Sequence, residues 1–212
     1  MRNLAIGKKF SLTKQLPHVK HQTISKRLSS KFDISLFYMD EKTDISTELY
    51  FEYKFYLILE GEVLIAKKRL KVGDSLVCLP MEPFCIEAIK ETIFLEITIN
   101  LTEEKMKNLE KGRVIELKNM IDYVDGAISN LDIASTKNMK MMLMAFDANE
   151  GLKPHSAPGD ALVVPLEGRA KVMVGDEEFE IGEQEQIVFP KNIKHNVTAI
   201  TKFKMMLVLV ID

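Results

Sequence analysis

The sequence predicts an all-β protein built from two tandem copies of one barrel domain. Short apolar or alternating segments recur about every 8 to 12 residues, separated by Gly, Pro, Asp and Asn, as in antiparallel sandwiches and barrels. The same order of sequence blocks then occurs twice along the 212 residues. This length agrees with two domains, because one domain takes roughly 100 to 200 residues.

The internal duplication shows how the two copies align. The block Leu59-Glu60-Gly61 matches Leu166-Glu167-Gly168 at an offset of 107 residues, and Asp40 matches Asp147 at the same offset. The offset has grown to 110 residues at Pro190, and the insertions fall in predicted turns. A repeat in constant order, with its gaps in turns, indicates two copies of a single folding unit.

We expect a first barrel over residues 1–100, a linker helix over 101–113 and a second barrel over 114–212. Thr102 is a good helix N-cap, acidic residues follow it, and Gly112 is a natural helix stop. In the second copy the apolar segments predict strands at 127–134, 139–147, 154–157, 161–167, 169–174, 177–181, 186–189, 194–199 and 203–211.

Composition excludes several classes of protein. The net charge of −2 leaves no basic surface for nucleic acid. The longest apolar run, Met205 to Ile211, is far short of the roughly 20 residues that span a bilayer, so we expect no membrane partner. Because no apolar segment follows Met1, we expect no signal peptide and a cytoplasmic location.

Two histidines of the second copy stand in a recognisable pattern. His155 begins a predicted strand thirteen residues before Gly168, and Pro190 precedes His195 by five residues. This pattern resembles the cupin superfamily, whose motifs read G-x5-H-x-H-x(3,4)-E-x6-G and G-x5-P-x-G-x2-H-x3-N. The resemblance implies two tandem double-stranded β-helix (jelly-roll) barrels. It also implies a divalent metal held by three His and a Glu.

The second copy keeps only part of that ligand set. His155 fits the first His and His195 fits the last, but Ala157 and Ala161 stand where the family has His and Glu. Asp160, one residue early, is a weak candidate for a further ligand. The resemblance thus implies at most one divalent ion (Fe, Mn, Ni or Zn) in this domain. A metal-free cavity, or histidines that only pack, remain open alternatives.

The first copy has lost the motif altogether. Glu48, Tyr50, Lys54 and Cys85 occupy the columns of His155, Ala157, Ala161 and His195. We therefore expect no metal in this domain. Its aromatic residues predict a barrel filled by side chains that serves as a scaffold. A second, metal-free pocket in this barrel is the alternative.

Apolar residues of the second copy suggest what its pocket would hold. The protein contains 12 methionines, and Met142, Met144 and Phe146 alternate along one predicted strand. If they share a face with His155 and His195, they form an apolar pocket with two polar groups, which suits a small organic ligand.

Two functions therefore remain open. The first is binding or sensing of a small molecule through the second barrel. The second is a metal-dependent enzyme, an isomerase or a dioxygenase-like cupin, that uses His155 and His195. The N-terminal arm, residues 1–22, and the sheet edges could be covered by the neighbouring domain or by the partner of a homodimer. The sequence identifies neither the ligand nor a reaction.

Overall fold

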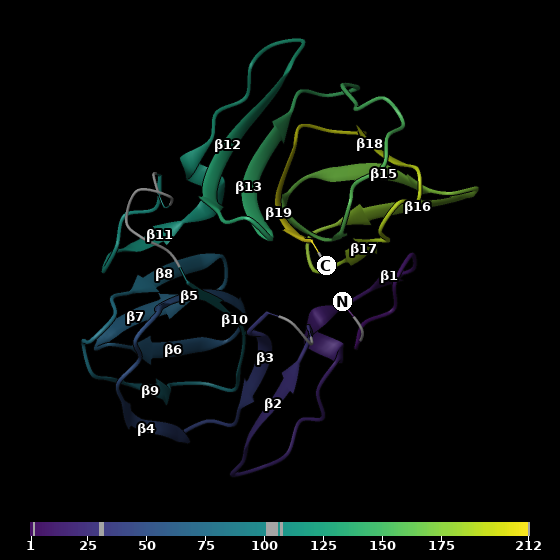
Figure 1. Cartoon of the computed structure of the whole chain (residues 1–212). Helices are drawn as coiled ribbons and strands as arrows, with labels where there is room; N and C mark the ends of the chain where they lie inside the picture. Colours follow the sequence, from purple (N-terminus) through teal and green to yellow (C-terminus); the bar gives the residue numbers. More distant parts are fainter. Residues whose placement is uncertain (2, 30–31, 101–105, 107, 212) are drawn as a thin grey trace. The chain divides into compact units, whose positions relative to one another are not determined.

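The computed structural model describes residues 1, 3–29, 32–100, 106 and 108–211, and strands dominate them (Figure 1). The chain divides into two compact units. The N-terminal unit comprises Leu12–Thr102 and Leu109–Glu116, and the C-terminal unit comprises Met1–Ser11, Glu103–Asn108 and Leu117–Asp212. Two sheets form each unit, so the all-β prediction with two barrels is confirmed.

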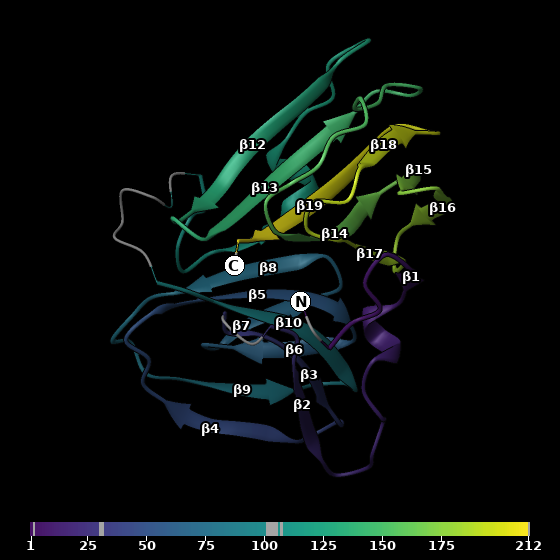
Figure 2. The ribbon, with the colours of Figure 1, turned by 45° about the vertical axis from the view of Figure 1, so that its right-hand side comes forward.

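The C-terminal unit contains a six-stranded and a three-stranded sheet. The larger sheet has the order β1-β17-β14-β19-β13-β12 and the smaller one β16-β15-β18; Figure 2 shows β12, β13 and β19 side by side. The strands of the larger sheet are β1 (Lys9–Phe10), β12 (Ile128–Ser135), β13 (Met139–Phe146), β14 (Asp160–Glu167), β17 (Gln186–Phe189) and β19 (Phe203–Val210). Those of the smaller sheet are β15 (Arg169–Val174), β16 (Glu177–Gly182) and β18 (His195–Ala199).

The N-terminal unit repeats this plan. Its sheets have the orders β11-β8-β5-β10-β3-β2 and β4-β9-β6-β7. The strands of the first sheet are β2 (Thr23–Arg27), β3 (Ile34–Met39), β5 (Tyr53–Glu60), β8 (Asp74–Cys78), β10 (Thr92–Ile99) and β11 (Val114–Glu116). Those of the second are β4 (Asp44–Glu48), β6 (Glu62–Ile65), β7 (Lys68–Lys71) and β9 (Phe84–Ala88). Two short 3₁₀ turns, Leu12–Lys14 and Leu117–Met120, complete the described elements.

Side-chain alternation fills each barrel with apolar residues. In β17 and β14 of the C-terminal unit, Ile187, Phe189, Ala161 and Val163 all belong to one buried cluster. Successive side chains of a strand point to opposite faces, so alternate residues of every strand line the barrel interior. The matching cluster of the N-terminal unit is more aromatic, with Tyr56, Phe84 and Phe94 in contact.

Each unit contains strand segments from a distant part of the chain. β1 pairs antiparallel with β17, so the first eleven residues group with the C-terminal unit and not with a barrel over 1–100. In the same way β11 pairs with β8 of the N-terminal unit. The physical reason is that β17 and β8 would otherwise end their sheets with unpaired backbone groups. The composition of these two short strands does not reveal their partners.

Two other predicted elements differ from the structure or fall outside it. Much of the helix expected over 101–113 lies on residues outside the described part of the chain, and the described residues 108–113 form turns and irregular backbone. The strand expected over 154–157 is reduced to an isolated bridge at His155. Pro154 and Pro158 lack the N–H groups that a longer ladder would need.

The two matched glycines have one structural role in both units. Gly61 and Gly168 have φ of +80° and +76°, and each joins the two strands of the Leu-Glu-Gly block. A Cβ atom at Gly61 would lie 1.9 Å from the Glu91 carbonyl oxygen, and one at Gly168 would lie 1.9 Å from that of Lys202. The shared sequence block therefore marks a close approach of two backbones that only glycine permits.

We predict that Gly61→Ala and Gly168→Ala each destabilise the protein by about 3 kcal/mol or more, because strain at positive φ adds to a clash with backbone. Gly126→Ala is the matched control, since Gly126 also has positive φ but a Cβ there meets nothing within 4 Å. It should cost only about 1 to 2 kcal/mol. Urea unfolding followed by circular dichroism measures all three; equal losses would contradict the role assigned to the close approach.

Candidate functional site

The two histidines predicted from the sequence lie directly opposite each other at one end of the C-terminal barrel. His155 forms an isolated antiparallel bridge with His195, the first residue of β18. The His155 N–H donates to the His195 carbonyl at 3.0 Å, and the His195 N–H donates to the His155 carbonyl at 2.8 Å. This pairing places both side chains on one face, and their ring centroids are 4.7 Å apart.

Backbone carbonyls determine which nitrogen of each ring carries the proton. Nδ1 of His155 lies 3.0 Å from the Lys153 carbonyl oxygen, and Nδ1 of His195 lies 2.9 Å from that of Ile193. A carbonyl oxygen only accepts, so Nδ1 must be the donor in both rings. In the neutral rings Nε2 then carries a lone pair, which can accept a hydrogen bond or bind a metal.

The two rings differ in environment. His195 is 3% exposed and stacks on Phe189 with the ring centroids 4.3 Å apart, whereas His155 is exposed at the rim. Burial lowers the pKa of His195 below its usual value of 6.5, and the neighbouring His155 lowers it further. His195 is therefore a neutral imidazole at neutral pH, and its Nε2 is an acceptor.

His195 contacts the apolar core of the barrel through Phe189. Met142 and Met144 of β13 belong to the same core cluster as Phe189, and Met142 is only partly buried. Phe146 belongs to the cluster too, but it pairs with Phe203, four residues farther along β13 from Met142. The structure adds Leu207 and Leu209 of β19, which are also partly exposed and pack against the core. Leu207 and Leu209 alternate along the last predicted strand, and this alternation is the sequence pattern from which their shared face could have been predicted.

Asp160, the third candidate metal ligand, has other partners. One carboxylate oxygen accepts a hydrogen bond from the Lys191 backbone N–H at 3.0 Å, and the other pairs with the amino group of Met1. Across the described residues, no group of three or more His, Cys, Asp or Glu side chains is placed to hold a metal ion. Two imidazoles alone fall short of the roughly three protein ligands of catalytic metal sites. The cupin metal does not fit this donor set.

The N-terminal barrel has a different residue at the place of His195. Glu48 pairs with Phe84 as His155 pairs with His195, so Phe84 and not Cys85 occupies that position. The match of Cys85 to His195 was therefore wrong by one residue. Cys85 is on the other face of β9, where its thiol donates to the Glu87 carboxylate at 3.2 Å. A slip of one residue in a strand exchanges the inner and outer faces.

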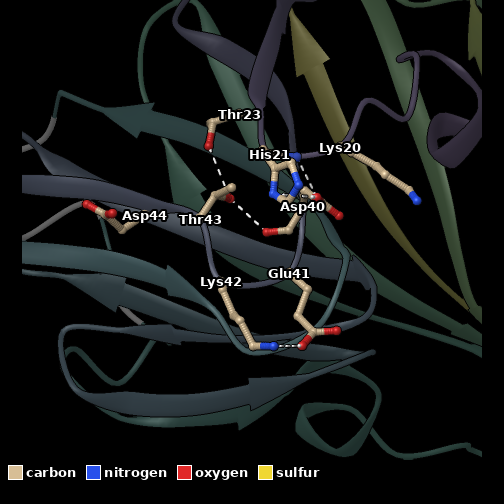
Figure 3. Close-up of a pocket in the computed structure, with 8 residues that line it drawn as sticks. All are labelled: Lys20, His21, Thr23, Asp40, Glu41, Lys42, Thr43 and Asp44. Carbon is tan, nitrogen blue, oxygen red and sulfur yellow. Dashed lines mark hydrogen bonds and ion pairs between the residues drawn. The ribbon is translucent and has the colours of Figure 1, made fainter.

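Two surface hollows lie beside the Asp40–Thr43 turn of the N-terminal unit. The larger, of about 830 Å³, is drawn in Figure 3, and the second, of about 630 Å³, shares Lys42 and Thr43 with it. In the larger hollow the His21 N–H donates to the Asp40 carboxylate at 2.5 Å, which is the main cause of the lowered pKa of Asp40. These polar groups hold the turn together, so we assign the hollow a structural role.

Comparison with known proteins places the site in a family. A family model described as a cupin domain matches residues 142–211, which include His155 and His195. Residues 142–211 therefore form a cupin domain. A cupin 2 conserved barrel domain protein from Leptotrichia buccalis is 28% identical and superposes with a TM-score of 0.83, over 98% of each chain. No curated protein matches the sequence.

Two further comparisons with solved structures concern the fold alone. A conserved protein of unknown function from Streptococcus pyogenes is 24% identical, with a TM-score of 0.50, over 54% of this chain and 98% of that chain. A salicylate 1,2-dioxygenase from Pseudaminobacter salicylatoxidans is 10% identical, with a TM-score of 0.61, over 84% of this chain and 70% of that chain.

Within the described residues, no helix is long and apolar enough to cross a membrane.

We predict that the His195 ring titrates below pH 6.5 and that Phe189→Ala raises its pKa, because the ring then becomes hydrated. The unfolded chain binds this proton more readily than the folded chain, so the free energy of unfolding should fall as the pH drops below about 6.5. NMR shifts of the His195 ring Cε1 against pH test the pKa. A value at or above 6.5 would contradict the buried neutral ring.

Proposed function

We propose that this cupin binds a small organic ligand through the mouth of its C-terminal barrel. The ligand has an apolar body and carries a hydroxyl or N–H group that donates to a histidine. The observation that carries this proposal is the pair of Nδ1–H donors, to Lys153 and Ile193, which leaves two Nε2 acceptors beside an apolar interior. Ligand sites commonly combine apolar walls with a few placed polar groups.

The partly exposed residues Met142, Leu207 and Leu209 support the apolar half of this proposal. They pack against the core from the interior face, yet solvent reaches them, so a ligand at the mouth would cover them. Burying one such side chain contributes about 1.5 to 3 kcal/mol. Cytoplasmic location and a homodimer remain parts of the proposal that rest on the sequence.

A metal-dependent isomerase or dioxygenase is the alternative, and one observation favours it. Metal-binding histidines usually donate their second ring nitrogen to a carbonyl or carboxylate, as both rings do here. Against it stands the lack of a third ligand in the described part of the chain, since the Asp160 carboxylate is held elsewhere. The dioxygenase from Pseudaminobacter salicylatoxidans supports only the shared fold.

Indole and 1-methylindole test the ligand proposal, because they differ in the single N–H donor. We predict that wild-type protein binds indole about 3- to 10-fold more tightly than 1-methylindole, the worth of one hydrogen bond. His195→Ala or His155→Ala should reduce this preference, and both substitutions together should remove it. Isothermal titration or NMR shift changes measure the affinities.

His18→Ala is the matched control, because His18 is a histidine of the N-terminal unit that pairs with Glu91. It should leave both affinities unchanged. Equal binding of the two indoles by wild-type protein, or a preference for indole that survives in the double variant, would contradict the proposal.

Elemental mass spectrometry decides between the two functions. We predict less than about 0.1 equivalent of Fe, Mn, Ni or Zn in protein purified without chelator, because two imidazoles retain a metal weakly. Near-stoichiometric metal that His155→Ala and His195→Ala both abolish would overturn the metal-free proposal in favour of the enzyme.

A further inference from the structure

A short segment, residues 6–10, runs along the edge of the C-terminal barrel. Its last two residues form β1, which lies beside β17 and pairs with it, as Figures 1 and 2 show. Ahead of β1, Ile6 forms a parallel bridge with Val188, and the Gly7 N–H donates to the Val188 carbonyl at 2.9 Å. We call this segment the strap. It ends two residues before Leu12, where the N-terminal unit begins.

Two lysines of the strap tie it to the smaller sheet and the connection that follows it. The Lys8 ammonium donates to both oxygens of the Glu177 carboxylate, at 2.8 and 2.7 Å. The Lys9 ammonium donates to the Glu185 carboxylate at 2.8 Å and to the Glu180 carbonyl at 3.1 Å. A single exposed ion pair contributes little, because solvent screens its charges. The two pairs act together with the ladder between β1 and β17.

Gly7 is the point at which the strap meets the connection from β17 to β18. It has a φ of +72°, and a Cβ atom there would lie 3.6 Å from Cγ of Pro190 and 3.8 Å from Cγ1 of Val174. These are ordinary contact distances, so the strap backbone lies next to both side chains. Pro190 begins a turn that closes when the Ile193 N–H donates to the Pro190 carbonyl at 3.3 Å.

Both neighbours of Gly7 lead to the His195 ring. The turn that begins at Pro190 carries the Ile193 carbonyl, which lies 2.9 Å from Nδ1 of His195. Val174 is the partner of His195 in the pairing of β15 with β18. The nitrogen of a neutral imidazole that carries the proton is determined by the hydrogen bond that the ring makes. The strap therefore contacts the supports of the group that holds this proton on Nδ1.

Hydrogen bonds to other segments hold the middle of the same turn. The Lys191 N–H donates to the Asp160 carboxylate at 3.0 Å, and the Asn192 N–H donates to the Ala157 carbonyl at 2.9 Å. Asn192 has a φ of +61°, a left-handed conformation that persists only where the surroundings maintain it. The strap and these two bonds support the turn at different residues, so loss of the strap lets the turn relax.

We propose that the strap is a positioning element for the His195 ring. By packing on Pro190 and Val174 it keeps the Ile193 carbonyl in place, and Nε2 of the ring stays an acceptor. When the strap leaves β17, the ring gains the form with the proton on Nε2, which donates instead of accepting. The effect on the ring stands by itself, whereas its consequence for ligand choice rests on the proposed function.

Reversal of both strap charges tests this role without changing the site. We expect Lys8→Glu combined with Lys9→Glu to raise the share of His195 rings with the proton on Nε2 about threefold or more, the effect of weakening one hydrogen bond. Ring ¹⁵N–¹H NMR spectra of the ligand-free, full-length protein distinguish the two forms when the imidazole is neutral. The preference for indole over 1-methylindole should fall at the same time.

Three further variants separate the role of the strap from a general effect of charge. Lys8→Arg with Lys9→Arg keeps both charges and should give the wild-type ring spectrum. Glu177→Lys, added to the double reversal, re-forms one ion pair and should restore part of that spectrum. Lys171→Glu is the matched control, because it reverses a similarly exposed ion pair with Glu178 on the same sheet, and it should leave the ring unchanged.

Hydrogen exchange at residue 7 shows whether the strap has left β17, since the Gly7 N–H is bonded there. If this exchange stays slow in the double reversal, Gly7→Pro detaches the strap directly, because proline has no N–H and cannot adopt this φ. The same change of the ring is then expected. An unchanged ring in the variant whose strap has left β17 overturns the proposal.

The two readouts keep this proposal distinct from the proposed function. A changed ring in the strap variants, together with equal binding of both indoles by wild-type protein, supports the role of the strap and refutes the ligand proposal. A wild-type preference for indole that persists in strap variants with an unchanged ring overturns the role of the strap alone.

Discussion

Side-chain alternation on paired strands is the constraint on which both barrels and both mouths depend. Because β5 and β14 have the same register against their neighbours, a given position along either strand opens into the interior of its own barrel. Lys54 and Ala161 thus occupy equivalent positions in the two strand ladders, but one side chain is charged and the other is apolar. A shift of one residue in either ladder would turn these side chains to the outside. The glycines at 61 and 168 hold this register, because two backbones approach closely there.

The two barrels show how one backbone can carry different interior side chains. In the C-terminal barrel the walls are apolar, and the two imidazoles at the edge each have Nδ1 bonded to a backbone carbonyl. In the N-terminal barrel the interior holds a buried Lys54–Glu96 pair beside a cluster of aromatic residues. Neither arrangement reproduces the set of metal ligands that the family motif describes. The fold therefore positions the site, while a few interior side chains decide its chemistry.

The sequence predicted the barrels and the histidine pair because both rest on local patterns. Turn residues, alternation and the repeated Leu-Glu-Gly block are readable without any partner strand. Features that depend on distant pairing were out of reach. The first eleven residues group with the C-terminal unit, and the Asp160 carboxylate accepts from the Lys191 backbone N–H. Phe84, and not Cys85, lies opposite Glu48. The buried Lys54–Glu96 pair joins residues 42 positions apart, and no periodicity indicates such a contact.

The most direct test of the account is a crystal structure of the protein soaked with indole. The account predicts the indole ring against Met142 and Leu207, with its N–H within hydrogen-bond distance of Nε2 of His195 or His155. It also predicts that each Nδ1 keeps its backbone carbonyl. A metal ion bound to both Nε2 atoms, or indole located only away from this mouth, would contradict the account.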